Sequence, residues 1–496
     1  MDTLKHHLLS FGKTELNTVT VTVFLSLLSL VALTINNNPL IFAGALILSA
    51  FFIWQTPVAG LLAALLTTMI FGEHFSLLPL QIGEDIYKIY ALDFVLAITF
   101  VCWLLQQKPG TIKLKVFLKE RKDFWLLVFF GFLVFNLGRS IIWGSDRTLA
   151  IATFKNYSYL LLYFLTVFLI ESREQLVRLL KIFIWGGILL IGFVVYGLVS
   201  GYGLWSEATA GLRYLSGLHA YYLTFSIIIL LVLMAYRQYL FGFLKTLFIF
   251  LVQVAGVVGG MFRHLWLGVL TAGTNLLIWL DFKRQNDLLK IVLIAFGVLA
   301  IVVLAALWGA GVWGSDYNFL QEKWFQAVLG RGVTLSQTGA LAESAAGWRL
   351  ATWQIALEKF LDNPLIGIGF GQKFFFEYRG FVDLVDIRNI HNDFASLLVQ
   401  LGLMGFLPFL LFNWYQVRDL IKLLKSKDND EIPRLKAATD VARDKLLVKP
   451  LALMFSGFYL VALFGVFFAI YLMFNGTSIF FWTVMGAITA LVKNEK

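Results

Sequence analysis

The stretch RNIHNDF, residues 388–394, is followed at once by ASLLVQLGLMGFLPFLLF, residues 395–412. An ionisable cluster therefore stands directly against an apolar run that continues to about Trp414. A helix needs about 20 consecutive apolar residues to cross a bilayer, and this run has that length. The pattern predicts that His391 is held at a membrane surface, at a height fixed by the span that follows it.

Composition extends this conclusion to the whole chain. Of its 496 residues, 59% are hydrophobic and 14% are charged, whereas soluble domains carry about 25% charged residues. The hydrophobic residues form long, separated runs, which favours membrane-spanning helices over the short alternating strands of a barrel. The single cysteine, Cys102, lies inside such a run and excludes a disulfide framework.

We predict an all-α fold, a polytopic transmembrane helical bundle of about fourteen spans. The pairs 38–72 and 245–280 allow other divisions into spans. The predicted spans are 18–35, 38–54, 57–72, 91–105, 124–143, 154–170, 183–201, 217–235, 245–260, 263–280, 290–308, 394–414, 450–473 and 477–493.

The positive charge indicates how the bundle is oriented. The formal net charge of +10 could suggest a nucleic-acid partner, but lysines and arginines collect in short loops between spans. This is the pattern of membrane orientation, in which the basic loops lie in the cytoplasm. We therefore predict no nucleic acid as a partner, and with an even number of spans both termini lie in the cytoplasm. The basic loops fall within 106–122, 171–178, 237–245, 283–290 and 415–449.

Three regions follow from this arrangement. Residues 1–308 form an N-terminal transmembrane bundle, and 394–496 form C-terminal transmembrane helices with a cytoplasmic segment at 415–449. Between them, 309–393 form one large extracytoplasmic loop. Loops of this length are usually functional or disordered, and this one carries helical patterning. We therefore expect the catalytic chemistry in this loop.

Two amphipathic helices are expected in the loop. In GWRLATWQIALEKFLDNP, five apolar residues recur on one helical stripe, and the sequence Asp-Asn-Pro at 362–364 ends the helix. A second amphipathic stretch, YNFLQEKWFQAVLG, starts at Tyr317. Together they would form a roof at the membrane surface. Glycines at 367, 369 and 371 then predict a tight turn back toward the bilayer. The striped residues are Leu350, Trp353, Leu357, Phe360 and Leu361.

The ionisable residues of the outer face are the candidates for chemistry. They are His391 and the arginines Arg213, Arg263 and Arg349. An arginine at the end of a span is often only an anchor that snorkels to the interface, and a lone interfacial histidine is often only packed. The six histidines are scattered without metal-ligand spacing, so we expect no metal. No phosphate-binding loop or dinucleotide fingerprint is present, so we expect no cofactor.

One histidine with several arginines suits the transfer of a sugar from a lipid diphosphate. The leaving group departs as an anion and needs no protonation, so the paired carboxylates of glycosidases are not required. One base with a pKa near neutrality takes the proton of the acceptor hydroxyl. Arginines hold the diphosphate and stabilise its growing charge.

The sequence around these residues resembles the O-antigen ligase/O-antigen polymerase superfamily of bacterial membrane glycosyltransferases. The resemblance rests on RLATWQIALEKFLDNPLIGIGFG followed by IHNDFASLLVQLGLMGF, about 60 residues from Arg349 to Gly405. Order, spacing and predicted membrane side agree with the family pattern. Arg213 and Arg263 resemble the family's outer-face arginines. GMFRHLWL replaces its usual Ser-Arg-Gly-Ala-aromatic run, so Arg263 fits the pattern less closely than His391 or Arg349.

The resemblance implies a GT-C-like fold and metal-independent, inverting transfer of a glycan from undecaprenyl diphosphate. His391 would deprotonate the acceptor hydroxyl, and Arg349, Arg263 and Arg213 would bind the donor diphosphate. Asn392 and Asp393 would support the site, by orienting the histidine or binding sugar. Partners would be the lipid-linked donor, the bilayer, and an acceptor that is a glycan, lipid A core or protein. The setting would be the bacterial inner membrane, with the active site on the periplasmic face.

Three activities within the superfamily stay open. A polymerase joins repeat units, a ligase passes a chain to lipid A core, and a related transferase acts on protein hydroxyls. The expected span count favours a polymerase for O-antigen or exopolysaccharide. A transporter or flippase of lipid-linked or anionic substrates is an alternative of another class. It would place charged residues in mid-span and break paired helices with glycine or proline. Asp93 and Lys155 come nearest to this pattern, and both lie near span ends.

Overall fold

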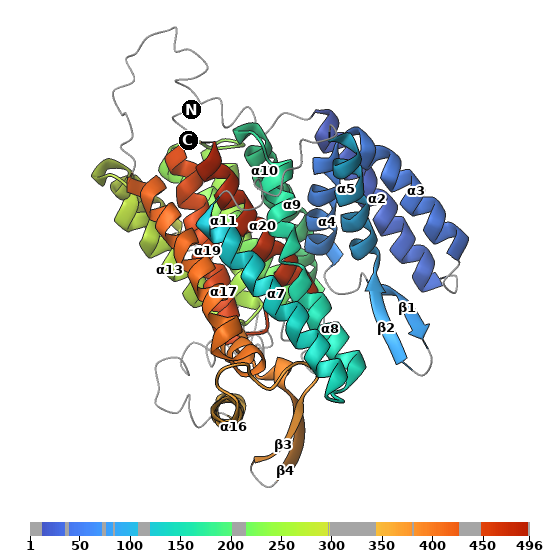
Figure 1. The fold of residues 1–496 in the computed structure, drawn as a ribbon. Coiled ribbons are helices and arrows are strands. Elements are labelled where there is room, and N and C mark those ends of the chain that lie inside the picture. Colours follow the sequence, from blue (N-terminus) through green and yellow to red (C-terminus); the bar gives the residue numbers. More distant parts are fainter. Residues whose placement is uncertain are drawn as a thin grey trace. The chain divides into compact units, whose positions relative to one another are not determined.

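The computed structural model describes most of the chain, and the statements below refer to that part. The described part is mostly helical, with two small antiparallel hairpins (Figure 1). The described residues are 12–34, 39–71, 76–82, 85–107, 120–200, 215–295, 297, 344–378, 381–425 and 448–494.

The chain forms two compact units. The first unit is made of Met1–Leu9, Leu180–Glu343 and Ser426–Phe464, and the second of Ser10–Leu179, Ser344–Lys425 and Gly465–Lys496. The first holds most of α10 (Arg173–Ser200) and α19 (Val448–Phe468), and the helices α11 (Gly217–Ala235), α12 (Phe243–Gly259) and α13 (Arg263–Trp279). The second holds α2 (Lys13–Thr34), α3 (Pro39–Gln55), α4 (Pro57–Phe71), α5 (Ala91–Gln106), α7 (Arg121–Ile142), α8 (Arg147–Ser158), α9 (Leu161–Leu169), α16 (Ser344–Asp362), α17 (Asp393–Lys425) and α20 (Asn475–Lys493).

Six helices are long and apolar enough to cross a membrane. Four shorter apolar helices accompany them among the described residues. A multi-pass helical membrane protein is therefore confirmed, while the count of about fourteen spans stays a prediction. The six are Arg121–Ile142, Arg173–Tyr196, Gly217–Ala235, Asp393–Lys425, Val448–Phe468 and Asn475–Lys493.

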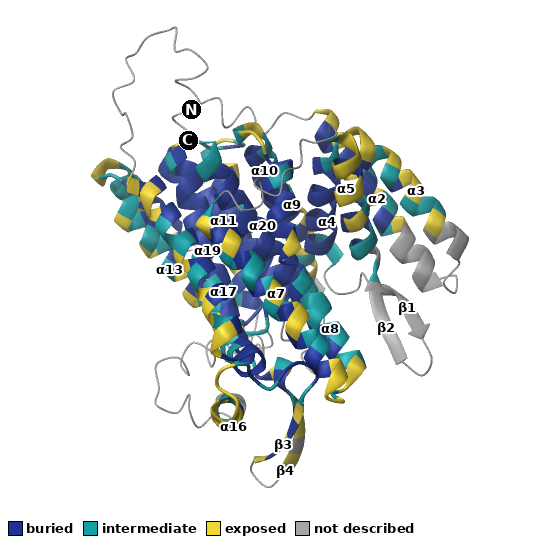
Figure 2. Ribbon diagram, in the orientation of Figure 1, coloured by how far each residue is buried: buried dark blue, intermediate teal, exposed yellow. Residues whose placement is uncertain are grey.

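Burial differs strongly among these helices (Figure 2). Every residue of α11 after Gly217 is buried, and so is nearly every residue of α20. The helix α7 instead exposes large apolar side chains, with Ile142 exposed by 79% and Phe135 by 51%. A soluble protein rarely exposes continuous apolar surface of this kind. On a membrane span such a face contacts lipid.

A buried ion pair joins two helices of the second unit. The Nζ atom of Lys122 on α7 lies 2.6 Å from Oδ2 of Asp419 on α17, and both side chains are at most 8% exposed. Beside it, the hydroxyl of Tyr163 donates to Oδ1 of Asp123 over 2.6 Å. Buried charges persist when they are paired and hydrogen-bonded. The ion pair fixes the register of α7 against α17, and the hydrogen bond joins α7 to α9.

Two predicted spans differ from the observed helices. The run predicted at 154–170 is divided into α8 and α9 by a turn at 159–160. The run predicted at 394–414 belongs to the longer α17, which is interrupted at Gly402, where φ is 62° and ψ is −172°. Hydropathy follows only whether a run is apolar, so it detects neither break.

The described part of the predicted outer loop contains one α-helix, one hairpin and a short 3₁₀ helix. The expected helix is confirmed as α16, which ends at Asp362, directly before Asn363 and Pro364. The strands β3 (Lys373–Tyr378) and β4 (Phe381–Asp386) pair in antiparallel register. The helix expected from Tyr317 lies outside the described residues. A second hairpin, β1 (Ser76–Ile82) and β2 (Asp85–Tyr90), lies in the segment between α4 and α5 that was predicted to be a plain loop.

The outer-loop elements share a hydrophobic core. Trp353 and Phe360 of α16 pack against it, as the expected stripe predicts, whereas Leu350, Leu357 and Leu361 are exposed. Alternate residues of the hairpin point inward, as the pleat of a strand requires. The core therefore fixes α16 and β3–β4 on the segment that leads into α17. It is formed by Ala356, Phe374, Phe376, Val385, Ile387, Ile390 and Val399.

Candidate functional site

The glycine loop at 364–371 docks into the interruption of α17. The amides of Ile368 and Gly369 donate to the carbonyls of Val399 and Gln400, over 2.9 and 3.0 Å. In return, the amides of Leu403 and Met404 donate to the carbonyls of residues 364 and 365. Backbone groups inside a membrane need partners within the protein. The glycine loop supplies the hydrogen-bond partners that the interrupted helix α17 lacks.

Glycine is required at this crossing because two backbones touch. A Cβ added at Gly367, where φ is 66°, would lie 2.5 Å from backbone atoms of Gln400. A Cβ added at Gly402 would lie 2.4 Å from the backbone of Leu365. Gly369 and Gly371 also have positive φ, so the turn expected from the three loop glycines is present.

His391 stands at the junction between the outer loop and α17. It follows the short 3₁₀ helix η5 (Ile387–Asn389), and its φ of 56° is in the left-handed region. The indole Nε1 of Trp353 donates to the carbonyl of Ile390 over 2.7 Å. The ring of Trp348 lies edge-on, with its centroid 6.0 Å from that of the imidazole. Strained residues of this kind persist where the surroundings over-determine them.

The electrostatic environment keeps this imidazole neutral. Burial lowers the pKa of His391 below its usual 6.5, and the positive charge of Arg349 lowers it further, to about 4. A charge acts in this way only at short range. The folded chain therefore brings His391 and Arg349, which lie 42 positions apart in the sequence, into one neighbourhood.

Asn392 and Asp393 make contacts within the fold. The side-chain oxygen of Asn392 accepts from the amide of Ala395 over 3.0 Å, which caps the start of α17. The Oδ2 atom of Asp393 accepts from the backbone amides of Tyr471 and Leu472, and its side chain is 1% exposed. These contacts hold the backbone on one side of His391.

Of the other two predicted arginines, one belongs to the first unit and one is not described. Arg263 is the first residue of α13 in the first unit, half-buried next to Phe262. Arg213 lies outside the described residues. Of the aromatic residues nearby, Phe374 packs in the outer-loop core. The structure thus describes a site around His391 and Arg349 in the second unit.

Sequence reasoning missed one buried cation near this loop. Arg139 lies on α7 and is 6% exposed, and its Nη2 atom donates to the carbonyl of Gly367 over 2.9 Å. The next residue, Ser140, accepts from the amide of Phe370 over 2.7 Å. An arginine inside the apolar run FNLGRSII was the available signal, since ionisable residues within spans are usually functional.

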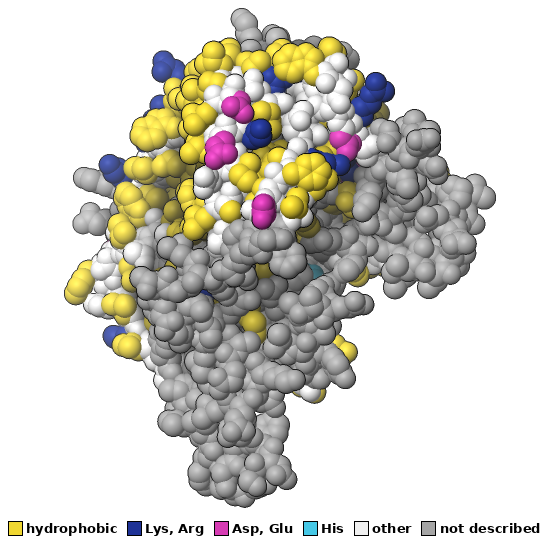
Figure 3. Space-filling model, turned by 90° about the horizontal axis from the view of Figure 1, so that it is seen from below, with side chains coloured by type: hydrophobic (Ala, Val, Ile, Leu, Met, Phe, Trp, Pro, Cys, Tyr) yellow, Lys and Arg dark blue, Asp and Glu magenta, His cyan; other side chains and the backbone are white. Residues whose placement is uncertain are grey.

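No group of three or more histidine, cysteine, aspartate or glutamate residues gathers within the part of the chain that is described. Figure 3 views the molecule from the end where α16 and β3–β4 lie, and its coloured part mixes acidic and basic side chains among hydrophobic ones.

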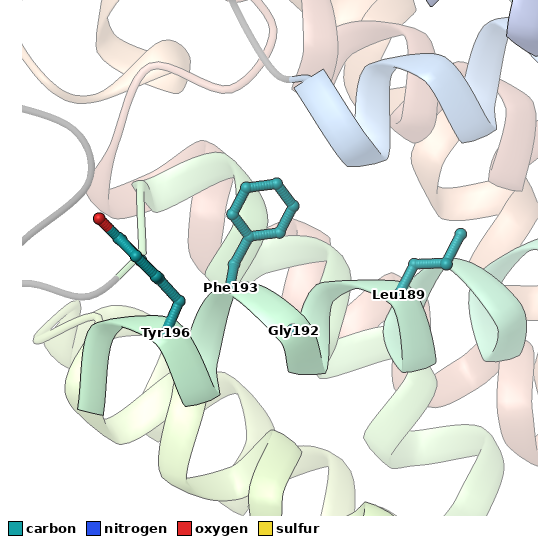
Figure 4. A pocket seen from close by; sticks show the side chains of 4 residues that line it. All are labelled: Leu189, Gly192, Phe193 and Tyr196. Atoms are coloured by element: carbon teal, nitrogen blue, oxygen red, sulfur yellow. The ribbon is translucent and has the colours of Figure 1, made fainter. Parts of the chain in front are cut away.

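An apolar pocket lies in the first unit, on α10. Its lining includes Gly192 and the side chains of Leu189, Phe193 and Tyr196, which project from one face of the helix (Figure 4). The ring of Phe193 stacks on that of His219, with centroids 5.8 Å apart. These lining residues offer a hydrophobic surface and a phenol, with no strong base.

Taken together, the fold and the site define a multi-pass helical membrane protein with a neutral imidazole and a guanidinium at the end of a span. Residues 248–410 match the family model described as O-antigen ligase. This match confirms the resemblance and assigns this part of the chain to the O-antigen ligase/polymerase superfamily of membrane glycosyltransferases. The matched region includes Arg263, Arg349 and His391 and excludes Arg213 and Arg139. No curated protein matches the chain.

Proposed function

We propose that this protein transfers a glycan from undecaprenyl diphosphate to an acceptor hydroxyl on the extracytoplasmic face of the bacterial inner membrane. The observation that carries the proposal is a neutral, backbone-strained His391 beside Arg349, inside the region that matches the O-antigen ligase family. A neutral imidazole is ready to accept a proton, and a guanidinium suits a diphosphate.

The reaction needs no cofactor in this scheme. The acceptor hydroxyl gives its proton to His391 while its oxygen attacks the anomeric carbon from the face opposite the diphosphate. The sugar–phosphate bond breaks, undecaprenyl diphosphate leaves as an anion, and the anomeric configuration inverts. Arg349, joined by Arg263 and Arg213, binds the diphosphate and stabilises the charge that grows on it.

Donor binding is also expected to raise the basicity of His391. The charge of Arg349 contributes to the low pKa of His391. A bound diphosphate neutralises that charge, so it raises the pKa of the imidazole toward its usual value. A base with a pKa closer to the working pH transfers protons more efficiently. The site therefore gains basicity when the donor is present.

The predicted membrane setting is part of the proposal. About fourteen spans in a GT-C-like arrangement place both termini in the cytoplasm and 309–393 outside. The leucines of α16 that are exposed, Leu350, Leu357 and Leu361, recur on one helix face. An exposed apolar face on a short amphipathic helix suits a position on the membrane surface, where it covers the site.

Polymerase is the activity we favour within the superfamily, because the expected span count includes an additional pair after the cytoplasmic segment 415–449. The alternatives are transfer to lipid A core by a ligase and transfer to a protein hydroxyl. Products distinguish them: a ladder of repeat units indicates a polymerase, and one addition to each acceptor indicates a ligase.

A transporter is less well supported, because Asp93 and Lys155, the charged residues that come nearest to its pattern, pair with each other. The Nζ atom of Lys155 lies 2.6 Å from Oδ2 of Asp93, and Lys122 is paired with Asp419. Ion pairs of this kind hold helices together. They leave the neutral His391 as the ionisable side chain best suited to chemistry at the outer loop.

The experiment uses the purified protein in lipid nanodiscs with a synthetic undecaprenyl-diphosphate oligosaccharide and a hydroxyl acceptor. Mass spectrometry is expected to show transferred glycan, with yield unchanged by a chelator. Arg349→Ala is expected to weaken both donor binding and transfer, while Lys359→Ala, on the same helix and exposed, has no effect. Export of intact donor without a new glycosidic bond would contradict the proposal.

A further inference from the structure

Arg139 is a buried cation with unused hydrogen-bond donors. Its Nη2 atom donates to the carbonyl of Gly367, but its Nε and Nη1 atoms are buried and have no hydrogen-bond partner among the described residues. The guanidinium also stacks near two rings, 5.0 Å from the centroid of Trp143 and 6.0 Å from that of Phe135. A fork of free N–H groups therefore lies against the glycine loop.

Such a group needs a partner. A buried donor without an acceptor costs free energy, and a buried charge without a counter-charge costs more. Within the part of the chain that is described, no carboxylate forms an ion pair with Arg139. Two acidic residues at this end of the unit pair with other cations, Asp146 with Lys373 and Asp386 with Arg388. The missing partner is therefore an anion from outside the described chain.

The surroundings indicate the depth of this anion in the membrane. Arg139 lies one turn from the end of α7, between the exposed aromatic residues Phe135 and Trp143. Exposed aromatic residues near the end of a span mark the interface between hydrocarbon and headgroups. Phosphate groups of lipids lie at this interface, and arginine forks match phosphate oxygens in geometry.

The loop beside the guanidinium is built for close approach. A Cβ on Gly369 would lie 3.2 Å from Nη2 of Arg139 and 2.8 Å from Oγ of Ser140. Ser140 separately holds the loop by accepting from the amide of Phe370. The attachment of the glycine loop to α7 therefore does not depend on Arg139 alone. Because Ser140 also holds the loop, the binding role of Arg139 can be tested separately from the attachment of the loop.

We propose that Arg139 binds a phosphate oxyanion of a membrane lipid through its free Nε–H and Nη1–H groups. The source is either the diphosphate of the polyprenyl donor, in which case the inference rests on the proposed function, or the headgroup of a bilayer phospholipid. Both present the same chemistry, a phosphate oxyanion at the interface. Arg139 thereby adds an anion site on α7 that the family match does not cover.

The test measures lipid binding to the purified full-length protein in detergent, without glycan transfer. One probe is undecaprenyl diphosphate without sugar, and the other is dioleoyl phosphatidylglycerol. Arg139→Met removes the donors and keeps the apolar stem, and Arg139→Lys keeps the charge without the fork. Two controls accompany them: Arg147→Gln removes an exposed arginine, and Ser140→Ala removes the other contact to the loop.

Arg139→Met is expected to weaken binding of one probe by about tenfold or more, as loss of charge-assisted hydrogen bonds implies. Arg139→Lys is expected to weaken it less, and both controls to bind as the unaltered protein does. Weakened undecaprenyl diphosphate binding identifies the donor, and weakened phosphatidylglycerol binding alone identifies a structural lipid. Unchanged affinity for both probes in Arg139→Met, or an equal loss in Ser140→Ala, would overturn the proposal.

This outcome is separable from the proposed function. If His391→Ala transferred glycan at the normal rate, the proposed base would be wrong, yet the binding results for Arg139 would stand. If Arg139→Met bound both lipids normally while His391→Ala lost transfer, only the anion site on α7 would be wrong.

Discussion

His391 is half-buried in the neighbourhood of Arg349, and burial together with the charge of Arg349 sets its protonation. Burial lowers the pKa of the imidazole, and the charge of Arg349 lowers it further, to about 4. The histidine is therefore neutral at physiological pH before the donor arrives. The cation that we propose to stabilise a departing diphosphate therefore also weakens the base before the donor binds.

The first prediction concerns the pH dependence of transfer. A base with a pKa of about 4 loses its neutral form only when the pH falls toward that value. The acid limb of kcat/KM, which reports the free protein, is therefore expected well below pH 6.5. The acid limb of kcat, which reports the donor complex, is expected at higher pH, because the bound diphosphate offsets the charge of Arg349.

Initial rates of transfer between pH 4 and pH 8 at low and saturating donor check this prediction. Arg349→Gln removes the positive charge that a bound diphosphate would neutralise. It should therefore shift the acid limb of kcat/KM to higher pH, toward the acid limb of kcat. Two limbs that coincide near pH 6.5 in the unaltered protein would mean that Arg349 does not act on His391.

Backbone strain at His391 gives a second prediction. The left-handed region costs a residue with a Cβ atom about 1–2 kcal/mol, whereas glycine adopts it without this steric cost. His391→Gly is therefore expected to be more stable than His391→Ala by about 1 kcal/mol, while neither variant transfers glycan. Thermal unfolding in detergent measures the difference. Because glycine loses more conformational entropy on folding than alanine, a His391→Gly protein less stable than His391→Ala would show that the positive φ carries no strain.

The crossing of the glycine loop and α17 gives a third prediction. Gly402→Ala places a Cβ 2.4 Å from the backbone of Leu365 and requires φ of 62°, which we expect to cost about 2 kcal/mol or more. The loop that leads toward His391 is then displaced, so transfer falls as well. Gly138→Ala on α7 is the control, because its added Cβ meets nothing within 4 Å.

Melting temperature and transfer rate are measured for both glycine variants. Gly138→Ala should match or slightly exceed the unaltered protein, since alanine favours a helix more than glycine does. A Gly402→Ala protein with normal stability and normal transfer would contradict the described packing of the loop into the helix.

The buried pair Lys122 and Asp419 gives a fourth prediction. Lys122→Met removes the 2.6 Å partner of Asp419 and leaves it only the longer 3.5 Å contact with Arg418, so it is expected to lower stability by about 3 kcal/mol. The double variant Lys122→Met, Asp419→Leu removes both charges and is expected to recover most of the loss. The free energies of unfolding of the two single variants and the double variant are measured and compared in a double-mutant cycle. Additive losses would show that the two side chains do not interact.

Several features of the fold could be predicted from the sequence. Long apolar runs gave the spanning helices, and the apolar stripe with Asp-Asn-Pro gave α16 and its end at Asp362. The three loop glycines gave a tight turn. These signals are local, because each depends on residue types within one or two turns of the chain.

Other features depend on partners distant in the sequence. The interruption at Gly402 is stabilised by the loop at 364–371, so hydropathy of the run 394–414 contains no sign of it. The sequences of β3 and β4, KFFFEY and FVDLVD, do not alternate strictly, and the face that each residue presents depends on a core shared with α16. Contacts between residues that are distant in the sequence decide which local structure forms, and the secondary-structure propensity of the residues alone does not.

The candidate site shows the same division. His391 and Arg349 were found from residue type and predicted membrane side, and their electrostatic contact follows from the fold. The contacts of Asn392 and Asp393 with the backbone were not visible in the sequence, since Asp393 bonds to amides 78 and 79 residues away. Arg139 was overlooked because a single charge in an apolar run resembles an anchor.

The most direct test of the account is transfer by His391→Ala. In nanodiscs with the undecaprenyl-diphosphate oligosaccharide, this variant is expected to bind donor with unchanged affinity and to transfer glycan about 100-fold or more slowly, the usual contribution of a general base. Asn389→Ala, exposed and two residues away, is expected to behave as the unaltered protein does. Transfer by His391→Ala at the normal rate would contradict the assignment of His391 as the base.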